Sequence, residues 1–156
     1  MEASGYINVR TYIQSGNIIF ESDIQSKSII SKALEQFIEK HYGFDVSVFV
    51  INKIDLEKAV DNNPYTEGRE EEPAGFKKIY VTFLSEIPSA ENFEKLQQAS
   101  IGDDLIHLKN DILYFKLESK ASDSKLSNNL IENKLKVRAT TRNWNTTLKL
   151  LFMMEM

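Results

Sequence analysis

The chain has 156 residues, of which 42% are hydrophobic and 27% charged, and its net charge is −4. These values are typical of a folded globular chain, and the length suits one domain or two small halves. The absence of cysteine excludes disulfides, thiolate catalysis and metal centres with cysteine ligands. No apolar run reaches the roughly 18 residues of a membrane span and no signal-peptide pattern opens the chain, so we expect a cytoplasmic protein.

The charges are unevenly distributed. Residues 55–75 hold seven acids and two bases, whereas residues 119–149 hold seven bases and two acids. The second stretch is either an ordinary solvated surface or a docking face for an anionic partner. The negative total argues against general nucleic-acid binding, which depends on Lys and Arg at phosphates.

Two alternating runs predict a β-hairpin near the start of the chain. Residues 1–5 are expected to be the tail of a helix, with Gly5 as its cap. Strands are predicted over 7–14 and 17–22, joined by a two-residue turn at Ser15-Gly16. The predicted cross-strand pairs are Gln14 with Asn17, Tyr12 with Ile19, and Arg10 with Glu21. One face would carry Arg10, Tyr12, Gln14, Asn17 and Glu21, and the other Val9, Thr11, Ile13, Ile18 and Phe20.

A helix is predicted after the hairpin, from about Gln25 to Tyr42, capped by Asp23 or Ser26 and ended by Gly43. Its apolar stripe would comprise Ile30, Ala33, Leu34, Phe37, Ile38 and Tyr42. The run 46–51 is apolar except for one serine, which predicts a well-covered strand. A short helix over about 55–61 would stop before Asn63-Pro64.

The polar stretch 65–75 is the predicted linker, so the domains would be 1–64 and 76–156. Beyond the linker, strands are predicted over 76–84, 105–109, 112–117 and 137–140. Helices are predicted over 89–99, 127–135 and 143–152, with Ser89 and Ser127 as caps of the first two.

This order of elements predicts the fold class. The second half reads strand, helix, strand, strand, helix, strand, which is the ferredoxin-like βαββαβ order. The first half gives the same order without its first strand. We therefore predict an α+β protein of two ferredoxin-like halves in tandem, the first lacking its N-terminal strand, with a C-terminal helix. The absent strand would be central, so its place stays open or is filled from elsewhere, and a second chain that fills it would give a homodimer.

The polar face of the hairpin is the first candidate site. Its candidate ligand-binding residues are Arg10, Tyr12, Gln14, Ser15 and Asn17. Together they could hydrogen-bond and stack a small planar or anionic ligand. The alternative is structural, with an Arg10–Glu21 ion pair, Tyr12 packed over Ile19, and the amides satisfying the turn.

The second candidate site is the corner where a strand gives way to the last helix. Its residues are Thr140, Thr141, Arg142, Asn143 and Asn145, with Lys125 as a more distant phosphate contact. Free N–H groups at a helix start, hydroxyls and a guanidinium suit an anion. The structural alternative makes Thr141 or Asn143 the cap, Trp144 a core anchor and Arg142 a surface residue.

Other signals of chemistry are weak. The sequence contains no glycine-rich dinucleotide or phosphate loop, no GxSxG and no HExxH. Two histidines far apart, His41 and His107, do not predict a metal site, and no cofactor is expected. Asp103-Asp104 is more typical of a solvated turn than of a catalytic acid pair.

Two longer motifs carry a family resemblance. Residues 8–17, Asn-Val-Arg-Thr-Tyr-Ile-Gln-Ser-Gly-Asn, and residues 139–146, Ala-Thr-Thr-Arg-Asn-Trp-Asn-Thr, resemble the bacterial family called domain of unknown function sixteen-ninety-seven. Ser124-Lys-Leu126 and Asn63-Pro64 stand where the resemblance places them. It implies a small cytoplasmic bacterial α+β protein of two related halves, and it implies no activity. Members of that family usually open with an apolar strand and an Arg-Gly-Ile-Asn-Val-Gly-Gly-like loop, which this sequence lacks.

Three hypotheses about function follow. The leading one is a non-catalytic ligand-binding or regulatory module whose ligand meets the hairpin face and the corner jointly. The second is an enzyme acting on a phosphorylated or nucleotide-like substrate, although no residue is obviously a nucleophile or base. The third is nucleic-acid binding through the basic stretch 119–149.

Overall fold

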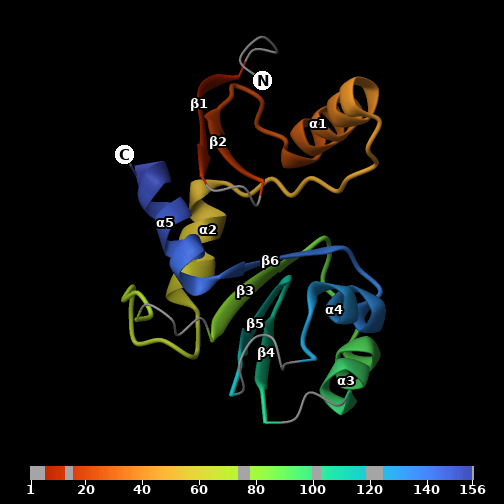
Figure 1. Cartoon of the computed structure of the whole chain (residues 1–156), viewed down its shortest axis with the longest axis vertical. Coiled ribbons are helices and arrows are strands. Elements are labelled where there is room, and N and C mark those ends of the chain that lie inside the picture. The colour runs from red at the N-terminus through yellow and green to blue at the C-terminus, as the bar shows by residue number, and fades with distance from the viewer. Residues whose placement is uncertain (1–5, 13–15, 74–77, 100–102, 119–124, 156) are drawn as a thin grey trace. The chain divides into compact units, whose positions relative to one another are not determined.

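The computed structural model describes residues 6–12, 16–73, 78–99, 103–118 and 125–155. These residues form an α+β structure with five helices and two antiparallel sheets, of two and four strands (Figure 1). Contacts divide the chain into two compact units, each described by itself below: unit 1 is residues 1–53 with 149–156, and unit 2 is residues 54–148. The predicted boundary at 65–75 stays a prediction. None of the helices in the described residues is long and apolar enough to cross a membrane.

Unit 2 contains a four-stranded sheet with helices on both faces. Its strands are β3 (Ile79–Leu84), β4 (Leu105–Lys109), β5 (Ile112–Lys116) and β6 (Ala139–Asn143), and its helices are α2 (Lys53–Asp61), α3 (Ala90–Gln98) and α4 (Asn128–Leu135). The sheet order is β4-β5-β3-β6, and all neighbours are antiparallel. The predicted sequence of strand, helix, strand, strand, helix and strand is present from β3 to β6. The predicted strand at 137–140 instead runs from Ala139 to Asn143, directly into the last helix, α5 (Trp144–Glu155).

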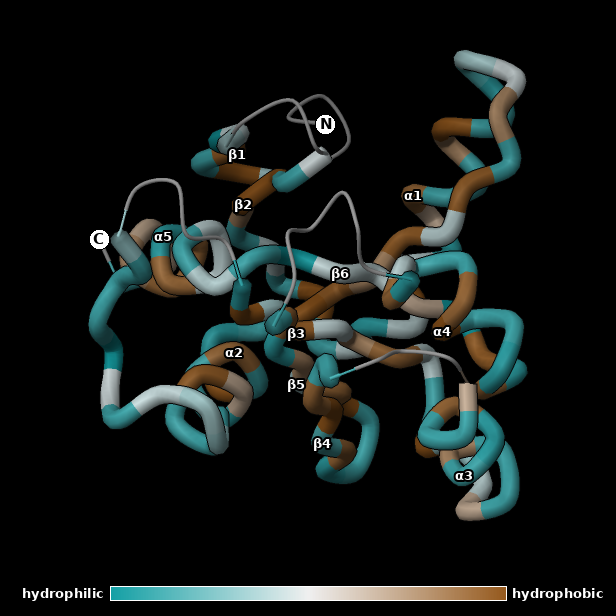
Figure 2. Tube along the Cα trace, turned by 60° about the horizontal axis from the view of Figure 1, so that its bottom comes forward, coloured by the Kyte–Doolittle hydropathy of each residue, from teal (hydrophilic) through white to brown (hydrophobic). Residues whose placement is uncertain are grey.

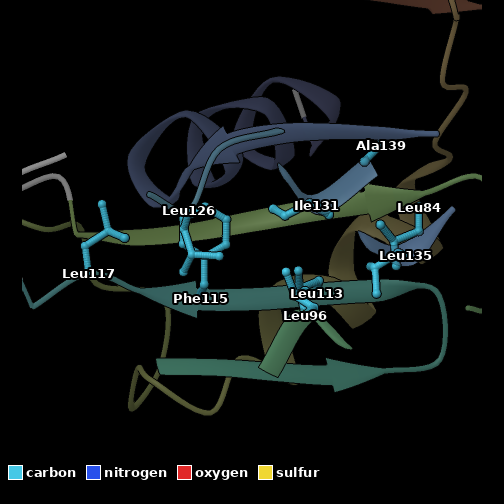
Figure 3. Close-up of a cluster of buried hydrophobic side chains, with 9 residues drawn as sticks. All are labelled: Leu84, Leu96, Leu113, Phe115, Leu117, Leu126, Ile131, Leu135 and Ala139. Atoms are coloured by element: carbon cyan, nitrogen blue, oxygen red, sulfur yellow. The ribbon is translucent and has the colours of Figure 1, made fainter. Parts of the chain in front are cut away.

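Alternation along β5 divides the unit 2 core between the two sheet faces. Leu113 and Phe115 lie in an apolar cluster with side chains of α3 and α4, and Figure 3 shows this cluster on one face of β3 and β5. Tyr114, between them, points to the opposite face, where its hydroxyl donates a 2.6 Å hydrogen bond to the Ala59 carbonyl of α2. Figure 2 shows α2 on one side of this sheet and α3 and α4 on the other.

The predicted caps Ser26, Ser89, Ser127 and Gly43 are present, and the predicted cap Gly5 lies outside the described residues. Ser26, Ser89 and Ser127 each accept a hydrogen bond from the backbone N–H three residues later, at 3.3, 3.1 and 3.1 Å. Gly43 ends α1 (Lys27–Tyr42) with φ +73°, a left-handed conformation that favours glycine.

Unit 1 contains the predicted hairpin, β1 (Ile7–Tyr12) with β2 (Asn17–Glu21), but in another register. Tyr12 pairs with Asn17 and Arg10 with Ile19. All three predicted pairs are therefore wrong: Gln14 with Asn17, Tyr12 with Ile19, and Arg10 with Glu21. A bulge between Ile7 and Arg10 shifts the pairing further, and Asn8 within it has φ +52°, which asparagine tolerates. Asn8, not Arg10, therefore reaches Glu21, through a 2.9 Å hydrogen bond. Of the face predicted to be covered, Val9 and Phe20 pack against the cluster that contains Ile30 and Leu34 of α1. Thr11 and Ile18 of that face are exposed, and Ile13 lies outside the described residues.

The predicted strand over 46–51 is wrong: the described chain has no strand between α1 and α2. A strand requires a neighbour for its backbone groups, and here the Val48 N–H donates to the Glu35 carboxylate (2.9 Å) while its carbonyl accepts from the Ser31 hydroxyl (2.6 Å). Two residues of the predicted α1 stripe, Ala33 and Tyr42, are exposed. The unit 1 core is correspondingly small, with Tyr6, Ile30 and Leu34 buried.

Candidate functional site

The hairpin's polar face is partly engaged within unit 1. Asn17 is buried, and its amide nitrogen donates to the Tyr12 carbonyl at 3.2 Å, where the two strands begin to pair. Tyr12 is half-buried beside it. Asn17 is thus a structural residue of the hairpin as well as a site candidate. Gln14 and Ser15, the other two candidates of this face, lie outside the described residues.

Arg10 is the one cation on this face, and it has no carboxylate partner among the described residues. The predicted Arg10–Glu21 pair is absent because the register places Ile19 opposite Arg10. One terminal nitrogen, Nη2, donates instead to the Met153 carbonyl in the last turn of α5, at 2.9 Å. A cation at a helix C-terminus is favourable, because the unsatisfied carbonyls there carry partial negative charge. The Nε–H of Arg10 is buried and has no hydrogen-bond partner in the described part of the chain.

In the corner of unit 2, Thr141 belongs to a partly buried polar network. Its hydroxyl lies 2.8 Å from that of Thr82, on the neighbouring strand, and 3.0 Å from the side-chain oxygen of Asn128, in α4. Asn128 also donates to the Ala139 carbonyl (3.0 Å) and to the Glu132 carboxylate (3.1 Å). Thr141 therefore connects β3 and β6 to α4, and its hydroxyl is occupied by internal bonds.

Thr140 and Arg142 lie together on the opposite face of β6. The Nη1 group of Arg142 donates to the Thr140 hydroxyl and to the Thr141 carbonyl, both at 2.9 Å. These bonds hold the guanidinium in one orientation, and burial lowers the pKa of Arg142. Arg142 is half-buried and not, as the structural alternative had it, an ordinary surface residue.

The residues that follow hold the start of α5 in place. Asn143 caps the helix, its side-chain oxygen accepting from the Thr146 N–H at 2.9 Å. Trp144 is fully buried, and its indole N–H donates to the Glu70 carbonyl at 2.8 Å. The Asn145 amide accepts from the Glu72 N–H (2.7 Å) and donates to the Glu72 carbonyl (3.0 Å), so it bonds both backbone groups of one residue.

Glu72 is a key residue that sequence reasoning missed. Its carboxylate accepts the N–H groups of Lys78 and Ile79, each at 3.1 Å, where β3 begins. It lies in a polar run that predicted only a linker, and nothing in the residue pattern distinguishes it from Glu70 or Glu71. The expectation of a solvated turn is wrong at Asp104, which is buried, and whose carboxylate accepts the Glu118 N–H at 2.8 Å after the end of β5.

The other candidates are not gathered into a site. Lys125 is exposed. In the residues that the structure describes, no three His, Asp or Glu side chains are grouped as metal ligands would be. The candidates thus form two groups, Arg10 with Tyr12 and Asn17 in unit 1, and Thr140 with Arg142 in unit 2.

A family model described as Protein of unknown function (DUF1697) matches residues 1–114, well over half of the chain. The chain belongs to this family. The matched range includes the hairpin motif at 8–17 and ends before the motif at 139–146. The family assignment therefore rests on unit 1 and most of unit 2.

A solved structure supports the fold over nearly the whole chain. It is titled the structure of conserved bacterial protein SP0830 from Streptococcus pneumoniae, and the likeness has a TM-score of 0.69 at 23% identity. The match covers 98% of this chain and 83% of that one. At this identity the likeness shows a common fold and nothing about activity. No curated protein matches the sequence.

Proposed function

We propose that the protein is a non-catalytic ligand-binding or regulatory module, and that a small anionic ligand binds the hairpin face at Arg10. The observation that carries the proposal is the Arg10 side chain, a half-buried cation with a buried, unpartnered Nε–H in the described chain. A buried donor without an acceptor costs about 1–3 kcal/mol, so native structures rarely keep one without a reason. An anionic oxygen would supply both the missing acceptor and the missing countercharge.

The guanidinium geometry narrows the class of ligand. Arginine presents a planar fork that bonds two oxygens of a carboxylate or phosphate at once. The hydrogen bond from Nη2 to Met153 fixes one arm of that fork, and a small rotation of the side chain would present the Nε edge. Tyr12 and Asn17, on the same face, add an aromatic ring and an amide, which suit a planar group attached to the anion.

Three probes test the proposal by thermal shift: inorganic phosphate, which is anionic; adenosine, which is planar; and AMP, which combines both. We expect AMP at about 100 times its Kd to raise the Tm by roughly 5 to 10 °C, with a smaller effect of phosphate. Arg10→Gln keeps a donor for Met153 but removes the charge, and it should abolish both shifts.

Arg138→Gln is the matched control, because it removes an exposed cation from unit 2 and should leave the shifts unchanged. Unchanged shifts in Arg10→Gln, or no shift with any of the three probes, would contradict the proposal. An equal loss of the thermal shifts in Arg10→Gln and Arg138→Gln would instead indicate that the anions are attracted by the overall charge of the protein and not by a specific site.

The two other hypotheses receive less support. A phosphate held by the start of α5 would have to compete with Asn143, which already caps the Thr146 N–H. Nucleic-acid binding requires Lys and Arg at phosphates, and of the basic stretch Lys125, Lys136 and Arg138 are exposed. Salt-dependent retention on heparin would favour the nucleic-acid hypothesis over our proposal.

We also infer that the two units repeat one ferredoxin-like βαββαβ arrangement. The order β4, β5 and α4 in unit 2 matches β1, β2 and α1 in unit 1, and the apolar segment 46–51, which is not a strand, follows α1 as β6 follows α4. An experimental structure in which β1, β2 and α1 did not superpose on β4, β5 and α4 would overturn the inference.

A further inference from the structure

The bulge in β1 lies between Arg10 and the point where Glu21 pairs with β1. In the regular part of the hairpin Arg10 lies opposite Ile19. Continued without interruption, this register would place Asn8 opposite Glu21, two residues from Arg10 along the strand. Instead Ile7 lies opposite Glu21, three residues from Arg10, because the bulge takes up one extra residue of β1. The bulge thus moves the Glu21 carboxylate away from the guanidinium.

This shift decides whether Arg10 has a countercharge. In a regular antiparallel pair, diagonal neighbours on one face lie about 7–8 Å apart, within reach of long side chains. Without the bulge, Arg10 and Glu21 would be such neighbours and could form an ion pair. In the described chain the Glu21 carboxylate instead accepts the Asn8 side-chain amide at 2.9 Å. The Arg10 side chain bonds the Met153 carbonyl, so its positive charge is not neutralised by Glu21.

The backbone of Asn8 is what allows the bulge. Its φ is +52°, in the left-handed region. One common form of bulge needs this conformation at its first residue, where glycine is the usual choice and asparagine is tolerated. A β-branched residue is strongly disfavoured there, because its side chain clashes with the backbone. The residue type at position 8 therefore determines whether the hairpin is bulged or regular.

We propose that Asn8 is a positioning residue of the anion site, because its left-handed backbone creates the bulge that prevents Glu21 from pairing with Arg10. This inference rests on the proposed function, in which Arg10 binds the anion. Asn8 acts through Glu21 and does not contact the ligand. Without the bulge, an incoming anion would have to break an ion pair and would meet a second negative charge beside the guanidinium.

Asn8→Val tests the proposal, because valine disfavours positive φ and favours the regular ladder. We expect the Kd for AMP, measured by thermal-shift titration of the full chain, to rise about three- to five-fold, as an exposed ion pair would require. Adding Glu21→Gln to this variant should restore the wild-type Kd, because glutamine cannot neutralise Arg10. A fold damaged by the valine would not be repaired by Glu21→Gln.

Two further variants separate the backbone of β1 from its side chains. Asn8→Gly is the conservative variant: it keeps positive φ but loses the exposed hydrogen bond to Glu21, so it should bind AMP as the wild type does. Thr11→Val is the matched control, because it places valine at an exposed residue of β1 that pairs regularly with Ile18. It should leave the Kd unchanged. Weak AMP binding by Asn8→Gly would overturn the proposal.

Nuclear Overhauser effects between β1 and β2 test the proposal without a ligand. We expect Ile7 opposite Glu21 in the wild type, and position 8 opposite Glu21 in Asn8→Val, together with contacts between the Arg10 and Glu21 side chains. If these contacts appear while the wild type binds none of the three probes, the proposed function is wrong and the role of Asn8 in separating Glu21 from Arg10 is supported.

Three results would overturn the role of Asn8 while leaving the proposed function intact. The first is wild-type strand pairing in Asn8→Val. The second is an unchanged Kd for AMP in that variant. The third is a weakened affinity that Glu21→Gln does not restore.

Discussion

Asn145 and Trp144 show how single side chains of α5 decide the course of a polar segment. Residues 70–72 are three consecutive glutamates. The backbone N–H and C=O groups of such a loop bond water where the loop is exposed. Where the loop packs against the fold, these groups need hydrogen-bond partners from the protein. Trp144 bonds the Glu70 carbonyl, and Asn145 bonds both backbone groups of Glu72. Asn145, a candidate ligand-binding residue, thus holds residues 70–72 together with Trp144.

Tyr114 gives a prediction at the same scale. Burial raises its pKa from the ordinary 10.0 to about 12. Below pH 10 the phenol is protonated in both states and its contribution to stability is complete. Between pH 10 and 12 the unfolded chain loses the proton first, so the free energy of unfolding falls as the pH rises. Tyr114→Phe should make this fall shallower in urea titrations between pH 8 and 12.

At pH 8 the free energy of unfolding of Tyr114→Phe should be about 0.5–1.5 kcal/mol lower than that of the wild type. At this pH the variant lacks the hydrogen bond to the Ala59 carbonyl, and the phenol of the wild type is not ionised. Burial also raises the pKa of Tyr65 and Tyr80. The decrease in the free energy of unfolding above pH 10 should therefore become smaller in Tyr114→Phe but should not disappear. An unchanged pH dependence would mean that Tyr114 is less buried than described.

At the scale of elements, α4 is joined to the sheet by polar as well as apolar contacts. Ile131 and Leu135 pack in the cluster with Leu113 and Phe115, while Asn128 bonds Thr141, the Ala139 carbonyl and Glu132. The Glu132 carboxylate also accepts the Ala139 N–H at 3.2 Å. Such a network fixes the position of α4 over β6. Apolar contacts alone would specify that position less closely, because they are not directional.

Two neighbouring asparagines test this contribution. Asn128→Ala should lower the free energy of unfolding by about 1–3 kcal/mol, because the Ala139 carbonyl and the Thr141 hydroxyl lose a partner. Asn129→Ala, one residue on and exposed, should change it by less than about 0.5 kcal/mol. Urea unfolding followed by Trp144 fluorescence measures both, and equal effects would show that the network does not stabilise α4.

At the scale of the whole molecule, the two units differ in how much they bury. Among the residues that the structure describes, one apolar cluster of unit 2 has nine buried residues, whereas the cluster around α1 in unit 1 has three. Burial of apolar surface is the main source of stability, and a two-stranded sheet is marginal by itself. Unit 1 should therefore unfold at lower denaturant than unit 2.

Two optical probes separate the units. The single tryptophan, Trp144, reports on unit 2, while α1, a helix of 16 residues, contributes to far-UV circular dichroism from unit 1. We expect the dichroism signal to begin its loss at lower urea than the fluorescence. Leu34→Ala should move only the earlier transition. Coincident curves would instead mean that both units unfold as one.

The sequence by itself determined the local elements and their order. Period-two and period-3.6 patterns predicted every described strand and helix, and Ser26, Ser89, Ser127 and Gly43 act as caps because capping depends only on adjacent residues. The same patterns assigned Val9 and Phe20 to the covered face of the hairpin. The family resemblance carried by residues 8–17 is likewise confirmed.

The tertiary structure alone decided which polar groups meet. The hairpin register differs from the predicted one from Tyr12 to Arg10, and a bulge at Asn8 shifts it by one further residue. The strand over 46–51 did not form, because a strand depends on a neighbour that its own residues cannot specify. Arg10 bonds a residue 143 positions away, and Glu72 one 73 positions away. No local pattern encodes contacts at such separations. Arg10 is still a candidate ligand-binding residue. Only the folded structure shows that its Nε–H is buried without a hydrogen-bond acceptor among the described residues.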